Sequence, residues 1–107
     1  MVRSPLTARA AILQVLDRPR SGLEIMRRLA ARSNGALRLQ CGSVYPALRR
    51  LARAGRVRGW IERRGRGRPR RNYELTVAGV AEADRVLTAL RSLLPAGRVV
   101  SGWGAVP

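Results

Sequence analysis

The spacing of apolar residues predicts two helices in the first third of the chain. Residues 7–17 carry apolar side chains at intervals of three and four with few polar interruptions, so they are predicted to form a helix buried over most of its surface. Ser21 and Glu24 then form the capping-box pattern, in which each side chain binds a free backbone amide at the start of a helix. A second helix is therefore predicted from Ser21 to Asn34 or Gly35, either of which can adopt the left-handed conformation that ends a helix.

A third helix is predicted to begin at Ser43, a favourable N-cap residue, and to end at Gly55. Pro46 is tolerated because the amides of the first turn have no acceptor within the helix. One face carries the expected core side chains Val44, Ala47, Leu48, Leu51 and Ala52. The opposite face carries Tyr45, Pro46, Arg49, Arg50 and Arg53. A short helix with a core side and an arginine side, placed directly after another short helix, is typical of a helix-turn-helix DNA reader.

A β-hairpin is predicted next. Residues 57–63 form one strand, with Val57 and Ile61 on one face and Trp60 on the other, and residues 72–75 form the returning strand. Trp60 is expected to pack on the hairpin rather than to bind a ligand. Residues 64–71 contain Gly and Pro and no acid, which indicates a cationic loop that contacts the DNA backbone or minor groove. Its arginines are Arg64, Arg66, Arg68, Arg70 and Arg71.

The last predicted helix begins at the N-cap Thr76 and runs to Leu94, just before a proline. Its apolar residues follow a narrow heptad seam, formed by Val80, Ala83, Leu87, Leu90 and Leu94. Such a seam predicts pairing with a second copy of the chain. The predicted fold is mainly α with a small β-hairpin: a winged helix-turn-helix domain (residues 1–76), a dimerisation helix (77–95) and an irregular tail (96–107).

The net charge agrees with a nucleic-acid partner. The chain has 22 basic residues, all of them arginine, against 6 acidic ones, for a formal charge of +16. A composition bias of the genome can account for part of this excess, but not for where the arginines lie. Arginine can pair with guanine through two hydrogen bonds or clamp a phosphate. The pattern leaves open which of Arg49, Arg50 and Arg53 reads bases, and whether Tyr45 contacts DNA or packs in the core.

The sequence contains few residues that would indicate an enzyme, a metal-binding protein or a membrane protein. There is no histidine, and the six acids are scattered among arginines, so no catalytic pair, metal cluster or cofactor site is expected. The single cysteine, Cys41, is expected to be a small, semi-buried residue rather than a redox switch. A cytoplasmic protein is expected, because no apolar run approaches the roughly 20 residues of a membrane span and the N-terminus has no secretory apolar segment.

Three segments carry a resemblance to the PadR family of winged-helix transcriptional regulators: residues 21–25 (SGLEI), 42–48 (GSVYPAL) and 70–76 (RRNYELT), the last followed by Gly79. The chain resembles the family in order and spacing over about residues 10–94. The resemblance implies a homodimer, the third helix in the major groove, and repression that a small molecule can relieve. Leu23 stands where family members usually carry an aromatic residue, and the short C-terminal region resembles the small branch without a separate effector domain.

The interpretation is therefore a dimeric DNA-binding regulator, a repressor on a palindromic operator. Any effector is expected to be a small aromatic molecule held where the protomers meet, with Trp103 from the tail as a candidate contact. The alternative is a structural RNA-binding or non-specific nucleic-acid-binding protein, because charge alone does not separate RNA from DNA. The heptad seam favours DNA, since a two-fold dimer suits a palindromic site.

Overall fold

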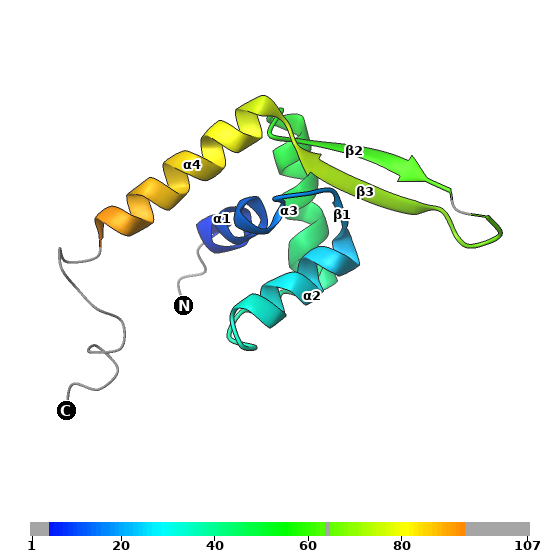
Figure 1. Ribbon diagram of the computed structural model, residues 1–107, viewed down its shortest axis with the longest axis horizontal. Coiled ribbons are helices and arrows are strands. Elements are labelled where there is room, and N and C mark those ends of the chain that lie inside the picture. The colour runs from blue at the N-terminus through cyan, green and yellow to red at the C-terminus, as the bar shows by residue number, and fades with distance from the viewer. Residues whose placement is uncertain (1–4, 64, 94–107) are drawn as a thin grey trace.

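The computed structural model describes residues 5–63 and 65–93, and these residues form four helices and a small three-stranded sheet (Figure 1). In chain order the elements are α1 (Pro5–Val15), β1 (Arg20–Ser21), α2 (Gly22–Arg32), α3 (Cys41–Arg53), β2 (Val57–Glu62), β3 (Arg70–Leu75) and α4 (Val77–Ser92). The sheet is antiparallel with the order β1-β3-β2. Figure 1 shows α1, α2 and α3 together below the sheet, with the β2–β3 hairpin extending to one side and α4 to the other. The predicted winged helix-turn-helix fold is confirmed.

The core lies between the first three helices and the base of the hairpin. Its largest fully buried side chains are Ile12, Ile25, Val44, Leu48 and Leu51, which the sequence pattern placed on the inner faces of their helices. The hairpin adds Val57 and Tyr73. Helix α4 contributes no fully buried apolar side chain; Ala83 and Val86 only pack against the edge of this core. Much of the apolar surface of α4 is consequently left exposed.

Helix α2 starts as the sequence predicted, with a strand that the sequence did not predict directly before it. The Glu24 amide donates to Ser21 Oγ (3.2 Å), and the Ser21 amide donates to Glu24 Oε1 (2.8 Å), so the capping box is confirmed. Arg20 and Ser21 also pair with Tyr73 and Asn72 of β3. Two residues are too few to show an alternating apolar and polar pattern, so the sequence pattern could not predict β1.

The capping box is expected to make the protein acid-sensitive. The hydrogen bond from the Ser21 amide lowers the pKa of Glu24 below its ordinary value of 4.5. A group whose pKa is lowered by folding stabilises the folded state above its ordinary pKa, and this contribution is lost as the pH falls through the folded value. We expect Ser21→Ala to reduce the free energy of unfolding at neutral pH by about 1 kcal/mol.

The stability of Ser21→Ala and the acid sensitivity of the wild type are both measured by urea unfolding, carried out at pH 7 and at pH 3.5. Glu24→Gln keeps the shape of the side chain but removes the titrating carboxylate, so this variant should lose less stability between the two pH values than the wild type. Equal losses in the two proteins would mean that Glu24 does not contribute to acid sensitivity.

Helix α3 begins earlier than predicted. Its N-cap is Gln40, not Ser43, and the Ser43 and Val44 amides both donate to the Gln40 carbonyl (2.9 Å each). Cys41 is exposed rather than semi-buried. Pro46 therefore lies in the second turn, not the first, and the hydrogen bond it cannot donate is the one to Gly42 near the helix start. The helix thus starts at Cys41 without a side-chain cap.

The end of α3 is as predicted. Gly55 has a φ of +75°, its amide donates to Ala52 (3.0 Å), and the Arg56 amide donates to Leu51 (2.8 Å), which together form a Schellman motif. Asn34 and Gly35 after α2 both adopt positive φ, of 54° and 83°. Helix α4 is capped by the Thr76 hydroxyl, also as predicted, and its last helical residue is Ser92; Leu94 and residues 96–107, with Trp103, lie outside the described residues. No helix in the described part of the chain is long and apolar enough to span a membrane.

Candidate nucleic-acid interface

Helix α3 presents an arginine face to solvent. Arg49, Arg50 and Arg53 are all exposed, as is Ser43, while Pro46 is half-buried. None of the three arginines forms a salt bridge with any acid among residues 5–63 and 65–93. These guanidinium groups are therefore available to an external anion. Ala52, predicted to be in the core, is exposed on the same helix because it lies beyond the edge of the buried stripe.

Tyr45 is half-buried, not exposed as its position on the helix predicted. Its ring lies across the start of α2: a Cβ added at Gly22 would lie 2.5 Å from the Tyr45 hydroxyl oxygen. Tyr73 lies in the same way over Gly59 of β2, where a Cβ added to the glycine would lie 3.1 Å from Cε1 of the Tyr73 ring. Burial raises the pKa of the Tyr73 hydroxyl. The two glycines thus give the tyrosine rings room between α2, α3 and the hairpin. The role of these two glycines was not predictable, because nothing in a single sequence marks which glycine faces an aromatic ring.

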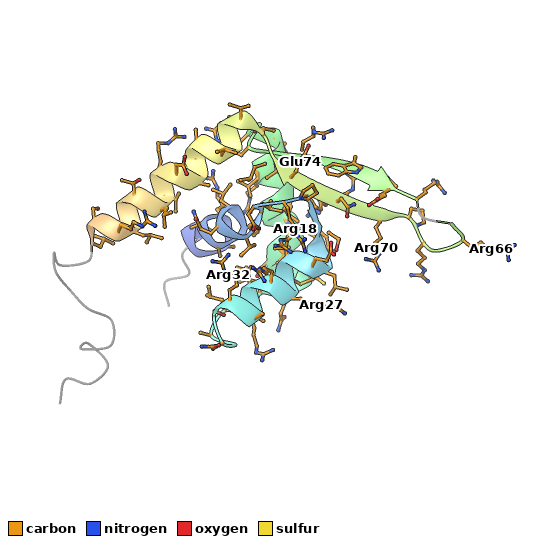
Figure 2. The ribbon with its side chains drawn as sticks, viewed as in Figure 1. Arg18, Arg27, Arg32, Arg66, Arg70 and Glu74 are labelled. Carbon is orange, nitrogen blue, oxygen red and sulfur yellow. The ribbon has the colours of Figure 1, made fainter. Side chains whose placement is uncertain are left out.

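The hairpin carries its arginines along its sides as well as at its tip. Arg66 and Arg68 lie in the connecting loop and are exposed, and Arg64 lies outside the described residues. Arg70 and Arg71, predicted to be in the loop, belong to β3, because β3 starts at Arg70 and pairs with Glu62 and Ile61 of β2. Adjacent residues of a strand point to opposite faces, so the side chains of these two arginines leave the strand in different directions. Figure 2 shows Arg66 at the tip of the hairpin and Arg70 pointing from β3 toward the side on which α2 lies.

A cleft connects the arginine face of α3 with the hairpin. It has a volume of about 830 Å³ and is lined by the first residues of α2, by α3 and by the hairpin loop with β3. The charged residues at its wall are Arg49, Arg68, Arg70 and Arg71, and Tyr45 and Tyr73 also line it. Its lining contains no acid, so the cleft is a cationic surface of the right chemistry for phosphate oxygens. Of the three α3 arginines that are candidates for reading bases, only Arg49 borders this cleft.

Two acidic residues, Glu74 and Asp17, form ion pairs with arginines outside α3 and the hairpin loop. Arg58 pairs with Glu74 and also lies over the Trp60 ring, 4.9 Å from its centroid, so half-buried Trp60 packs on the hairpin as predicted. Asp17 pairs with the buried Arg20 (3.1 Å), and the hydrogen bond from Arg20 lowers the pKa of Asp17. Neither pair involves an arginine of α3 or of the hairpin loop, and α2 carries further exposed arginines, Arg27, Arg28 and Arg32. No group of His, Cys, Asp and Glu in the described ranges could hold a metal ion.

Helix α4 exposes a second, apolar surface. Val80 and Leu90 of the predicted seam have exposed fractions of 49% and 50%, whereas Leu87 is half-buried. Ala83 is partly buried against its own core, where its carbonyl accepts a hydrogen bond from Gln14 of α1 (2.9 Å). The seam pattern missed Leu93, which is 78% exposed close to Leu90. The apolar surface of α4 is therefore shifted relative to the heptad positions.

Comparison with known proteins points to one group. A family model described as "Transcriptional regulator PadR-like family" matches residues 12–85. No curated protein matches the sequence significantly. Among solved structures, a PadR-like transcription factor from Bacteroides fragilis is 22% identical with a TM-score of 0.73, over 83% of this chain and 84% of that one.

Two further solved structures extend this likeness. Pex from Synechococcus sp. is 28% identical with a TM-score of 0.70, over 87% of this chain and 85% of that one. Bacillus subtilis PadR in complex with operator DNA is 21% identical with a TM-score of 0.65; the match covers 85% of this chain but 49% of that one. The family match over residues 12–85 includes α2, α3 and the hairpin, which are the elements that build the arginine face and the cleft.

Proposed function

This chain belongs to the PadR-like family of transcriptional regulators, and we propose that it binds operator DNA sequence-specifically as a homodimer and represses transcription. The exposed arginine face of α3, which forms no salt bridge within residues 5–63 and 65–93 and adjoins the cationic cleft beside the hairpin, is the observation that carries the proposal. A helix of this kind fits the major groove of B-form DNA, where base edges can be distinguished. Bacillus subtilis PadR, a relative in fold, was solved in complex with operator DNA.

The proposed roles of the site residues follow from their positions. Ser43, Arg49, Arg50 and Arg53 of α3 face the base edges and the adjoining phosphates, with Tyr45 and Pro46 at the border of this surface. The hairpin arginines bind phosphates on both sides of the groove; they are Arg66, Arg68, Arg70 and Arg71, with Arg64 assigned from the sequence alone. Residues 1–76 form the DNA-binding unit in this proposal, residues 77–95 the dimerisation helix, and residues 96–107 a tail.

Competition between nucleic acids tests the proposal against a structural RNA-binding role. The deep, narrow major groove of A-form RNA does not admit a reading helix. With a labelled duplex from the DNA flanking the gene as the probe, unlabelled DNA of the same sequence should compete at least about 100-fold better than random duplex DNA or the matching RNA duplex. RNA that competes as well as DNA would favour the alternative, a structural RNA-binding protein.

The hairpin loop is expected to contribute affinity without specificity. Replacing Arg66 and Arg68 by alanine should weaken binding to specific and random duplexes equally. It should also flatten the dependence of log K on log salt concentration by about one slope unit for each lost phosphate contact. Titrations between low and moderate salt measure this, with Arg91→Ala on α4 as the control, because Arg91 is exposed on the part of the molecule away from the hairpin. An unchanged slope in the double variant would show that the loop does not reach the phosphates.

A small aromatic effector has a candidate site in the same proposal. An apolar hollow of about 750 Å³ lies between α1, the end of α2 and the second half of α4, with Ala11, Leu29, Val86 and Leu90 in its lining. This volume is ordinary for a small-molecule site. An effector there would release DNA only as far as it binds the released geometry more tightly than the DNA-bound one. Tryptophan fluorescence and operator release, followed together during titration with planar aromatic compounds, test this; binding without release would leave a site but no switch.

A further inference from the structure

The end of α3 and the start of α4 are held together by hydrogen bonds from Thr76 to the turn that ends α3. The Thr76 amide donates to the Arg56 carbonyl (3.0 Å), and the Thr76 hydroxyl donates to the Gly55 carbonyl (2.6 Å). The same hydroxyl accepts a hydrogen bond from the Gly79 amide (3.0 Å) and so caps α4. We call Gly55, Arg56, Thr76 and Gly79 the α3–α4 joint.

Gly79 is the residue that allows this close approach. It is buried, and a Cβ added to it would lie 1.9 Å from the carbonyl oxygen of Arg56 and 3.0 Å from its carbonyl carbon. A backbone atom cannot move aside as the end of a flexible side chain can. Any other residue at position 79 would therefore push α4 away from the turn that ends α3.

Two further contacts make the joint stiff. The half-buried side chain of Arg56 lies against Glu82 of α4, with 3.6 Å between its buried Nε atom and Glu82 Oε1. On its other side, Gly55 and Arg56 complete the Schellman motif of α3 through their amides. The same turn of backbone, Gly55 and Arg56, therefore ends α3 and binds the first turn of α4. A movement of either helix is consequently transmitted to the other.

We propose that Gly79 is a positioning residue that fixes the angle between the recognition helix α3 and the dimerisation helix α4, and thereby the distance between the two recognition helices of the dimer. This inference rests on the homodimer of the proposed function. Because half-sites on DNA are read at a defined spacing, the distance between recognition helices determines which operator spacing the dimer accepts. Gly79 thereby influences which operator spacing the dimer accepts, although it makes no contact with DNA itself.

The size of the effect follows from the helix geometry. Helix α4 has a second anchor at Ala83, whose carbonyl accepts the hydrogen bond from Gln14. With a rise of about 1.5 Å per residue, the four residues from Gly79 to Ala83 span about 6 Å, so a displacement of about 1 Å at position 79 tilts α4 by roughly 10°. Two protomers that tilt together should change the distance between their α3 helices by about 3 Å or more.

Cys41 provides a direct measure of that distance. It is the only cysteine in the chain, it is exposed, and it is the first residue of α3. A nitroxide label on Cys41 of the full-length protein places one spin on each recognition helix of a dimer, and double electron–electron resonance reports the distance between them. Gly79→Ala should shift this distance by about 3 Å or more, or broaden it clearly, whereas Val77→Ala, at an 89% exposed position of the same turn, should leave it unchanged.

A second pair of variants covers the case in which Gly79→Ala does not fold. Thr76→Val removes the hydroxyl that binds Gly55 and Gly79, and it should broaden the distance distribution; Thr76→Ser keeps the hydroxyl and should give the wild-type distribution. A general loss of stability would lower the melting temperature without moving the distance in the folded dimer. Wild-type distances in a folded Gly79→Ala, or equal widths in the two Thr76 variants, overturn the inference. If the wild type itself gives no dipolar coupling, the homodimer is wrong, and this inference with it.

Discussion

Replacing Leu90 by glutamate is expected to convert the proposed dimer into a monomer and to weaken operator binding by about 100-fold or more. Leu90 is half exposed on α4, beside the 78% exposed Leu93, in the apolar surface proposed to meet the second protomer. A carboxylate buried there without a partner costs several kcal/mol, of order the whole gain from apolar contact at such a surface. Loss of the dimer also removes the gain of about 10² to 10⁴ in affinity that comes from linking two half-site contacts.

Sedimentation velocity at micromolar concentration, together with operator titration, measures both effects. Thr88→Glu is the matched control: it adds the same charge to α4 at an exposed polar position two residues away, and so on a different face of the helix. It should remain dimeric and bind DNA. A wild-type protein that sediments as a monomer at this concentration would contradict dimerisation through α4.

The second large effect is expected from the arginine face of α3. Alanine at Arg49, Arg50 or Arg53 should lower affinity for the operator more than for random DNA. The expected loss is about 1–3 kcal/mol of discrimination for a residue that pairs with a guanine through two hydrogen bonds, equivalent to about 5- to 150-fold in the affinity ratio. None of the three has a salt bridge in the described chain, so removing one leaves no acid unpaired and the fold should be little affected.

Affinities for the operator, for single-base variants of it and for random duplex identify which arginine reads which base. Arg91→Ala again serves as the control for the loss of one charge. Arg49 borders the cationic cleft, so a phosphate role for it would appear as an equal loss on all duplexes. If all three substitutions reduce specific and random binding by the same factor, α3 does not read bases.

Much of the fold was predictable because its signals are local. The capping box at Ser21 and Glu24, the end of α3 at Gly55 and the Thr76 cap each depend on a few neighbouring residues, and each was predicted correctly. The apolar stripes of α1, α2 and α3 likewise identified the core. The N-cap of α3 was predicted three residues late, because Ser43 is a better cap in isolation than Gln40, and backbone hydrogen bonds to Gln40 decided the boundary instead.

The features that sequence analysis missed depend on contacts between distant segments. Strand β1 is formed by Arg20 and Ser21 only because β3 lies beside them. Tyr45 is half-buried because Gly22, over twenty residues earlier, leaves room for its ring. Ile61 shares a strand face with buried Val57 but is 55% exposed, since the hairpin extends beyond the core at that point. The close approach of Gly79 to Arg56 is likewise a tertiary contact without a sequence pattern of its own.

A footprint of the full-length protein on its operator tests the central proposal, a two-fold dimer that reads DNA, most directly. Fragments selected from a random duplex pool and from the DNA flanking the gene would be probed with hydroxyl radicals at physiological salt. The expected result is two protected half-sites in inverted orientation, with centres about one helical turn, 10–10.5 base pairs, or a multiple of it apart. A single unpaired site, or protection without any sequence preference, would contradict a dimeric, sequence-specific regulator.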